Sequence, residues 1–294
     1  MIIDFHTHTF PDKSSEKIVN HLAHIGCIPP HTDGSVIGLF SSMKEADIDY
    51  SVNLPVMTKP SQVEKVNSSL IQQQEYLLDM KIITFGGMHP NYTNYKEELL
   101  RLKQAGIPGI KLHPAYQNVD LDDIRMMRII DEASSQGLIT LVHAGIDIGI
   151  YDHNYSSVAH ILKLLKEVAP EKLVLAHMGN WGRWNEVESD LAGAPVYFDT
   201  AFSYGPVTPL PDAPRAPYIS YNLHPKDFVR LVRKHGTDKI LFGTDSPWEN
   251  QQDYVKRISH MDFTKEQWYE VIEKTVPPKT IEINKKAFDV GYHL

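Results

Sequence analysis

Cysteine is almost absent from this sequence: the 294 residues contain a single one, Cys27. One cysteine excludes an internal disulfide framework and a cysteine-based zinc finger, and it is typical of a reducing compartment, where Cys27 would be a core or loop thiol. Long hydrophobic runs are absent as well, since no apolar stretch approaches the length of a membrane span. The first residues show no charged leader with an apolar stretch and a cleavage site. We therefore expect a cytoplasmic protein with no membrane partner.

Positive charge is in short supply. The sequence has 29 Lys and Arg against 37 Asp and Glu, which gives a formal net charge of −8 and a pI near 6.0. Surfaces that bind nucleic acid are basic, so we expect no nucleic acid among the partners of this protein. An anionic substrate is not excluded, because a bound metal ion and one lysine can dominate the local field.

A glycine-rich phosphate-binding loop is also missing. No G-x-G-x-x-G pattern follows a predicted strand, which argues against a doubly wound dinucleotide-binding sheet. The sequence instead shows a regular alternation of strands and helices. Strand candidates such as Leu138–Val142 are apolar throughout or nearly so, as in a parallel sheet that is buried on both faces. The predicted strands are 2–8, 48–56, 81–89, 107–113, 138–143, 172–177, 195–202 and 239–244.

Helical patterns separate most of these strands. The predicted helices are 14–25, 61–80, 95–104, 121–136, 156–168, 181–191, 225–235 and 264–274, with a further short segment at 283–288. Strand and helix alternating eight times within about 250 residues is the size and pattern of a (β/α)8 TIM barrel, an α/β fold. No linker or low-complexity stretch interrupts the pattern, so we expect one domain over residues 1–294. The irregular stretch after the first strand is either a lid or a packing element.

Residues that bind metals recur at the ends of the predicted strands. In the first strand, His6 and His8 share one face because side chains alternate, and two adjacent imidazoles form half of a Zn²⁺ site. The carboxyl ends of all strands of a barrel meet at one face, where active sites lie. We therefore expect the strand-end residues to converge there. They are His6, His8, His89, Lys111, His113, His143, His177, Asp199 and Asp245.

Five strand-end motifs carry a family resemblance that spans the chain from the first strand to the eighth. Each motif is weak alone, but together they are specific. They resemble the amidohydrolase superfamily, and most closely its amidohydrolase-2 branch, which includes aminocarboxymuconate-semialdehyde decarboxylase and related aromatic-acid decarboxylases. The motifs are Asp4-Phe5-His6-Thr7-His8, Ile110-Lys111-Leu112-His113-Pro114, Leu141-Val142-His143-Ala144-Gly145, Leu175-Ala176-His177-Met178-Gly179 and Leu241-Phe242-Gly243-Thr244-Asp245-Ser246-Pro247.

The resemblance implies one divalent metal ion held by His6, His8, His143 and Asp245. Three imidazoles and a carboxylate suit Zn²⁺, with an open position for a water molecule whose pKa the metal lowers. His177 would be the general base or would stabilise developing charge, and Asp245 would also shuttle a proton.

The resemblance and the strand-end positions also suggest roles for other polar residues. In other branches of the superfamily a carboxylated lysine at the place of Lys111 bridges two metals; in the branch resembled here it stays unmodified and its ammonium group would hold a substrate carboxylate. We favour the mononuclear interpretation. His113 and His89 are expected to contact substrate, with capping of a strand before proline as the alternative. Asp4 is expected to be a buried hydrogen-bond acceptor behind the ligands, and Asp199 to be mainly structural.

Two reactions fit the same set of ligands. In the first, activated water attacks an amide, ester or lactone of a small molecule; in the second, an aromatic or unsaturated acid is decarboxylated without oxidation. We expect the hydrolase, which is the commoner chemistry of the fold, whereas an arginine facing the metal, Arg183 or Arg215, would favour an acid substrate. A barrel without catalytic activity is a third hypothesis. The Pro-rich loop at 206–217 and the C-terminal segment are candidate contacts of a homodimer.

Overall fold

We describe residues 1–211, 223–260, 269, 278–283, 285 and 286 of a computed structural model. All described strand pairings are parallel, and they form two runs, β1-β2-β3 and β4 through β9 in sequence order. The strands are β1 Ile3–Thr7, β2 Tyr50–Asn53, β3 Ile82–Thr84, β4 Gly86–Gly87, β5 Gly109–Leu112, β6 Ile139–Val142, β7 Leu173–Leu175, β8 Tyr197–Asp199 and β9 Ile240–Leu241.

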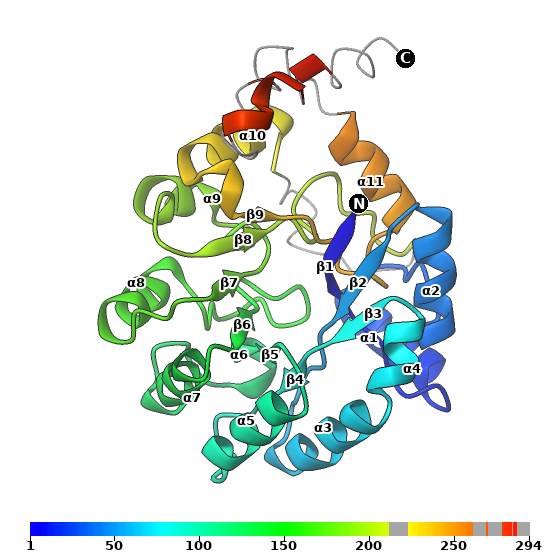
Figure 1. Cartoon of the computed structure of the whole chain (residues 1–294), viewed down its shortest axis with the longest axis vertical. Coiled ribbons are helices and arrows are strands. Elements are labelled where there is room, and N and C mark those ends of the chain that lie inside the picture. Colours follow the sequence, from blue (N-terminus) through cyan, green and yellow to red (C-terminus); the bar gives the residue numbers. More distant parts are fainter. Residues whose placement is uncertain (212–222, 261–268, 270–277, 284, 287–294) are drawn as a thin grey trace.

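The two runs close into one ring (Figure 1). Strands β3 and β4 are halves of the predicted third strand, because only Phe85 separates them and its N–H donates to the Asn53 carbonyl at 3.0 Å. At the other junction, the Phe5 N–H donates to the Phe242 carbonyl at 2.8 Å and the Asp245 N–H to the His6 carbonyl at 2.8 Å. Eight strand positions in a closed parallel ring confirm the predicted (β/α)8 barrel.

The helices surround this ring (Figure 1). Their apolar faces pack on the strands, and a separate apolar cluster that includes Phe85, Leu141 and Val174 fills the inside of the barrel. The helices are α1 Ser15–Gly26, α2 Val36–Glu45, α3 Val63–Gln72, α4 Gln74–Asp79, α5 Tyr95–Gln104, α6 Pro114–Gln117, α7 Ile124–Ser135, α8 Val158–Glu167, α9 Trp184–Glu186, α10 Pro225–His235 and α11 Gln251–Ser259. Short turns of other helix types are η1 Pro60–Gln62, η2 Val187–Leu191, η3 Thr237–Lys239 and η4 Pro278–Thr280.

Some predicted helices differ from the observed ones. The single helix predicted at 61–80 is broken at Gln73, whose backbone leaves the helical region. The helix predicted from Trp181 begins only at Trp184, because Gly182 has a φ of +76°, in the left-handed region. The predicted helix 264–274 lies outside the described residues apart from Tyr269, as do Arg215 and parts of the Pro-rich loop and the C-terminal segment. Within the described residues, no helix is both long and apolar enough to span a bilayer.

The Asp4 side chain joins the two strands at which the ring closes. Its buried carboxylate accepts hydrogen bonds from the Thr244 N–H at 2.9 Å, the Thr244 hydroxyl at 2.5 Å and the Gln251 amide at 2.7 Å. Burial raises the pKa of Asp4 to about 6, although these hydrogen bonds oppose the rise. The carboxylate thus ties β1 to the end of β9 and to α11, and no hydrogen bond to a histidine ring is found for it among the described residues.

Replacing Asp4 with alanine should therefore destabilise the barrel. Four buried donors, these three and the His6 N–H, would lose their acceptor, and we expect the free energy of unfolding to fall by about 3 kcal/mol or more. Urea unfolding checks this value. Asp12→Ala, an exposed carboxylate in the loop before α1, is the matched control and should change stability by about 0.5 kcal/mol at most. Equal losses in both variants would contradict the role given to Asp4.

Candidate metal centre

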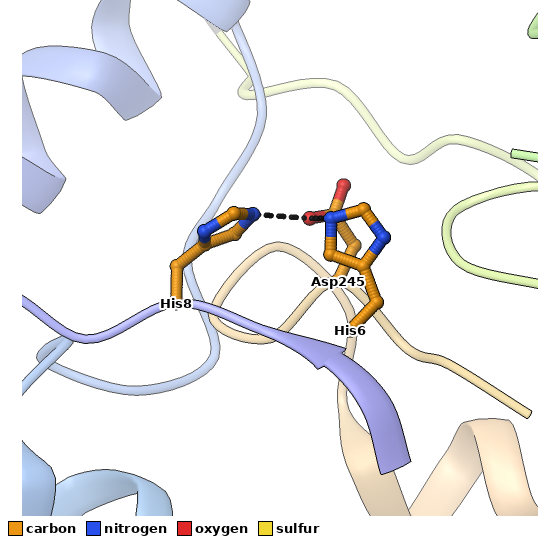
Figure 2. A group of neighbouring side chains, drawn as sticks. All are labelled: His6, His8 and Asp245. Carbon is orange, nitrogen blue, oxygen red and sulfur yellow. Dashed lines mark ion pairs between the residues drawn. The ribbon is translucent and has the colours of Figure 1, made fainter. Parts of the chain in front are cut away.

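Three of the predicted ligands meet at the carboxyl-terminal end of the barrel (Figure 2). His6 lies in β1, His8 follows it, and Asp245 follows β9. The Asp245 Oδ1 atom is 3.1 Å from His8 Nε2 and 3.5 Å from His6 Nε2. Ligand atoms of the three side chains all lie within 4.8 Å of one another. Residues almost 240 positions apart are thus brought together by closure of the ring.

The backbone around these residues is shaped to bring them close. A Cβ atom built on Gly243 would lie 2.9 Å from the Cβ of His6, so only glycine lets the end of β9 approach β1 this closely. Asp245 itself has a φ of +70°, in the left-handed region that non-glycine residues seldom adopt. Such backbone conformations collect at functional sites, where the surrounding structure holds them.

Hydrogen bonds fix which nitrogen of each imidazole carries the proton. His8 Nδ1 is 2.7 Å from the Leu54 carbonyl, which can only accept, so Nδ1 donates and, in a ring with one proton, Nε2 is bare. His6 Nδ1 lies 2.8 Å from Asp199 Oδ2 and donates in the same way. Burial also lowers the pKa of His6 well below its usual range and keeps this ring neutral. Asp199, and not Asp4 as predicted, is thus the buried carboxyl group that hydrogen-bonds to the ring of a proposed ligand, His6.

These proton positions show that the three residues fit a cation. The bare Nε2 of His8 and a carboxylate oxygen of Asp245 are both acceptors, and at 3.1 Å they repel each other unless a proton or a metal ion lies between them. Two imidazole nitrogens and one carboxylate are a common ligand set of catalytic zinc. Here a second hydrogen bond orients each imidazole ring, and the backbone conformation orients Asp245. The metal ion that the resemblance implies and this donor set therefore agree.

Lys111 lies beside this group. Its ammonium nitrogen is 3.2 Å from His6 Nε2, to which it donates, and the side chain is buried. Burial lowers the pKa of Lys111 and raises that of Asp199, while the attraction between the two opposes both changes. The Lys111 ammonium group is thus the hydrogen-bond donor to the unprotonated Nε2 atom of His6.

His143, the fourth predicted ligand, is not part of this group. His177 Nδ1 lies 2.8 Å from the Ala201 carbonyl and must donate to it, so His177 Nε2 accepts from His143 Nδ1 at 3.0 Å. Burial lowers the pKa of His177 to about 4, which leaves the ring neutral at pH 7. His143 Nε2 is then bare, and it is buried without a hydrogen-bond partner in the described part of the chain. The Ala201 carbonyl thus sets the direction of both rings.

A second buried group contains His143 with His113 and Asp147. The rings of His113 and His143 stack with their centroids 4.2 Å apart. Asp147 Oδ2 lies 3.6 Å from His113 Nε2 and 3.9 Å from His143 Nε2, and burial raises the pKa of Asp147 to about 7. Asp147 was not among the predicted site residues, because it lies in a loop four residues beyond His143 and not at a strand end.

Both groups open into one cavity of about 430 Å³. The polar residues predicted for the site that line it are His6, His8, Lys111, His113, His143, His177 and Asp245, and Asp147 lines it too. Phe10 and Trp181 are also in its wall.

Two predicted positions lie elsewhere. His89 is not among the described residues that line the cavity: β4 ends at Gly87, and the His89 ring turns to accept a hydrogen bond from the Asn91 N–H at 3.1 Å. The expected contact of His89 with substrate therefore has no support, and its position matches the capping alternative. Arg183 is exposed and does not line the cavity either.

Comparison with known proteins places this site in a family. The sequence model of the amidohydrolase family Amidohydro_2 matches residues 3–280. The chain belongs to this family. A search of curated proteins gave no significant match to this amidohydrolase. The recognition made from the strand-end motifs is confirmed.

Solved structures show the same fold at low sequence identity. A TIM-barrel protein of uncharacterized function from Bordetella bronchiseptica has a TM-score of 0.68 and 16% identity, covering 92% of this chain and 94% of that one. The 5-carboxyvanillate decarboxylase LigW from Sphingomonas paucimobilis has a TM-score of 0.62 and 12% identity, covering 90% and 94%. A probable 2-pyrone-4,6-dicarboxylic acid hydrolase from Acinetobacter baumannii has a TM-score of 0.58 and 17% identity, covering 91% and 94%. At these identities the likeness shows the fold alone.

Proposed function

We propose that this amidohydrolase is a mononuclear metal-dependent hydrolase, acting as one domain on an ester, lactone or amide of a small molecule. The observation that carries the proposal is the contact of two bare imidazole nitrogens with the Asp245 carboxylate. His6, His8 and Asp245 would hold a divalent cation, and the donor set suits Zn²⁺ best. Such an ion polarises a carbonyl group and lowers the pKa of bound water from 15.7 towards about 7.

The other residues of the cavity handle protons and orient the substrate. His143 Nε2 is the bare nitrogen available to accept the proton that the attacking water loses. His177 shares the resulting charge, since it already accepts a hydrogen bond from His143 and is held by the Ala201 carbonyl. Asp245, which lines the cavity, keeps the predicted second role of proton shuttle, while Lys111 and His113 contact the substrate from the cavity wall. His89 is left out of the site.

The direction of proton transfer favours a hydrolase. Attack by water needs a proton acceptor, and the neutral His143–His177 pair presents one. Decarboxylation needs the opposite, a donor that protonates the carbon left by the departing carboxyl group. The one observation that favours this second candidate is Asp147, whose raised pKa would keep a proton available in the cavity.

Substrate panels separate the two reactions. The zinc-loaded protein should hydrolyse members of a panel of lactones, phenyl esters and anilides, and it should release no CO₂ from a panel of aromatic acids. Hydrolysis is followed by acid release and decarboxylation by CO₂ trapping on the same preparation. CO₂ release without hydrolysis would contradict the proposal and establish the lyase.

The mononuclear interpretation predicts an unmodified Lys111. Native mass spectrometry of the zinc-loaded protein should show about one metal ion per chain, and peptide mass spectrometry should show Lys111 without an added carboxyl group. The reason is that the Lys111 amine already lies against His6 Nε2 and faces carboxylates as a cation. Two metals per chain together with a carboxylated Lys111 would establish the binuclear alternative.

A further inference from the structure

The cavity has a polar end and a larger apolar part. Away from His6, His8 and Asp245, its walls come from parts of the chain that are distant in sequence. These parts are α1 with the segments before and after it, the segment after β2, α3, the loop after β6, and the loops that carry Trp181, Phe202 and Trp248. The apolar lining residues are Phe10, Pro11, Ile18, Leu22, Ile28, Leu54, Pro55, Val56, Val66, Ile146, Ile148, Trp181, Phe202 and Trp248.

Helix α1 is a fixed wall of this cavity. Ile18 and Leu22 are four residues apart, on one face of the helix, and both line the cavity. The adjacent face is packed, since Val19 is only 1% exposed. The insertion that carries α1 is fastened at its base: the Phe10 N–H donates to the Gly34 carbonyl at 2.8 Å, and the His31 N–H to the Pro247 carbonyl at 2.7 Å. In this structure α1 packs on the barrel and shapes the cavity, which supports the packing element among the two roles left open by the sequence.

The charges around the cavity leave little provision for a substrate anion. Among the described residues that line it, Lys111 is the only lysine or arginine. Lys111 is itself buried and faces the carboxylates of Asp199, Asp245 and Asp147. These carboxyl groups are already the electrostatic partners of Lys111, so its ammonium group is not available to a further anion in the apolar part of the cavity. A substrate carboxylate in the apolar part of the cavity would therefore lose its water molecules and gain no ion-pair partner. The free energy of this desolvation exceeds that gained from most binding contacts.

We propose that the substrate is an uncharged ester or lactone whose apolar body, a ring or a short alkyl chain, lies between α1 and the aromatic wall. This inference rests on the proposed hydrolase function and specifies its substrate class. A volume of about 430 Å³ accommodates such a small molecule. Leu22 and Ile18 are then the residues that determine selectivity along the apolar body.

Two matched pairs of substrates test whether the cavity prefers an apolar, uncharged substrate. The value of kcat/KM should rise from δ-valerolactone to δ-decalactone by about fourfold for each methylene group that becomes buried. It should fall at least about 100-fold from phenyl acetate to its 4-carboxylate derivative, because Lys111, the one lysine or arginine of the described wall, already faces carboxyl groups of the protein.

Variants of α1 test whether the apolar part of the substrate lies against this helix. Leu22→Arg should lower kcat/KM for δ-decalactone at least about tenfold and raise it at least about tenfold for the 4-carboxylate of phenyl acetate. Retained activity on δ-valerolactone, which lacks the alkyl chain, shows that the variant has folded. Asn20→Arg puts the same charge on the exposed face of the helix and should change neither value.

The outcomes separate this inference from the function on which it rests. Ester or lactone hydrolysis that is indifferent to chain length, or that prefers the carboxylate derivative, overturns the substrate class and leaves the hydrolase intact. Equal effects of Leu22→Arg and Asn20→Arg overturn the placement of the substrate against α1. CO₂ release from aromatic acids with no hydrolysis of any ester or lactone overturns both proposals.

Discussion

Replacing His8 with alanine should remove both the bound metal and the activity of this enzyme. In the proposed site, His8 supplies one of three ligand atoms, and its Nε2 atom is 3.1 Å from the Asp245 carboxylate. With two ligands left, the site no longer has the number of protein ligands that catalytic zinc sites use. Metal activation of water is worth several kcal/mol, so we expect kcat/KM to fall at least about a thousandfold.

His21→Ala is the matched control for this loss, since His21 is exposed on α1 and is not among the described residues that line the cavity. It should keep about one zinc ion per chain and wild-type activity. Metal content is measured by atomic emission on protein dialysed against a weak chelator. A His8→Ala variant that retained stoichiometric zinc would show that the ion, if any, binds elsewhere, such as at the group of His113, His143 and Asp147.

Replacing His143 with alanine should have a different effect, loss of turnover with the metal retained. The His143 ring belongs to the group with His113 and Asp147, and its Nδ1 atom donates to His177. Its bare Nε2 is the proposed proton acceptor, and loss of a general base lowers kcat by about 10²- to 10⁴-fold. His177→Ala should likewise keep the metal and lose turnover, since it removes the group that orients His143 and shares its charge.

Metal analysis and steady-state kinetics on both variants decide the point. Loss of zinc from His143→Ala would make His143 a ligand after all, as the family resemblance implied. Full activity in His177→Ala would remove the proposed sharing of the proton between the two rings.

Much of the site could be predicted from the sequence because barrel geometry makes strand ends converge. His6, His8 and Asp245 follow or end β1 and β9, and adjacent strands of a closed ring bring such residues together regardless of their distance in sequence. The same rule placed Lys111, His143 and His177 around the cavity. The strand pattern was readable because buried parallel strands are apolar almost throughout.

The directions of individual side chains could not be predicted in this way. The orientation of His143 depends on a carbonyl, that of Ala201, which lies 58 residues further along the chain and has no sequence signal. Asp147 projects from a loop into the cavity, where no periodicity applies. His89 was misplaced because β4 ends at Gly87, so the chain has already begun to turn at the residue that the pattern assigned to the strand end.

The most direct test of the proposed centre is a zinc titration of the metal-free protein, with bound metal and ester hydrolysis followed in the same sample. We expect activity to be absent at the start, to rise in proportion to the zinc bound, and to level off at about one ion per chain. Hydrolysis by the metal-free protein, or activity that appears only with a second ion, would contradict a single catalytic ion held by His6, His8 and Asp245.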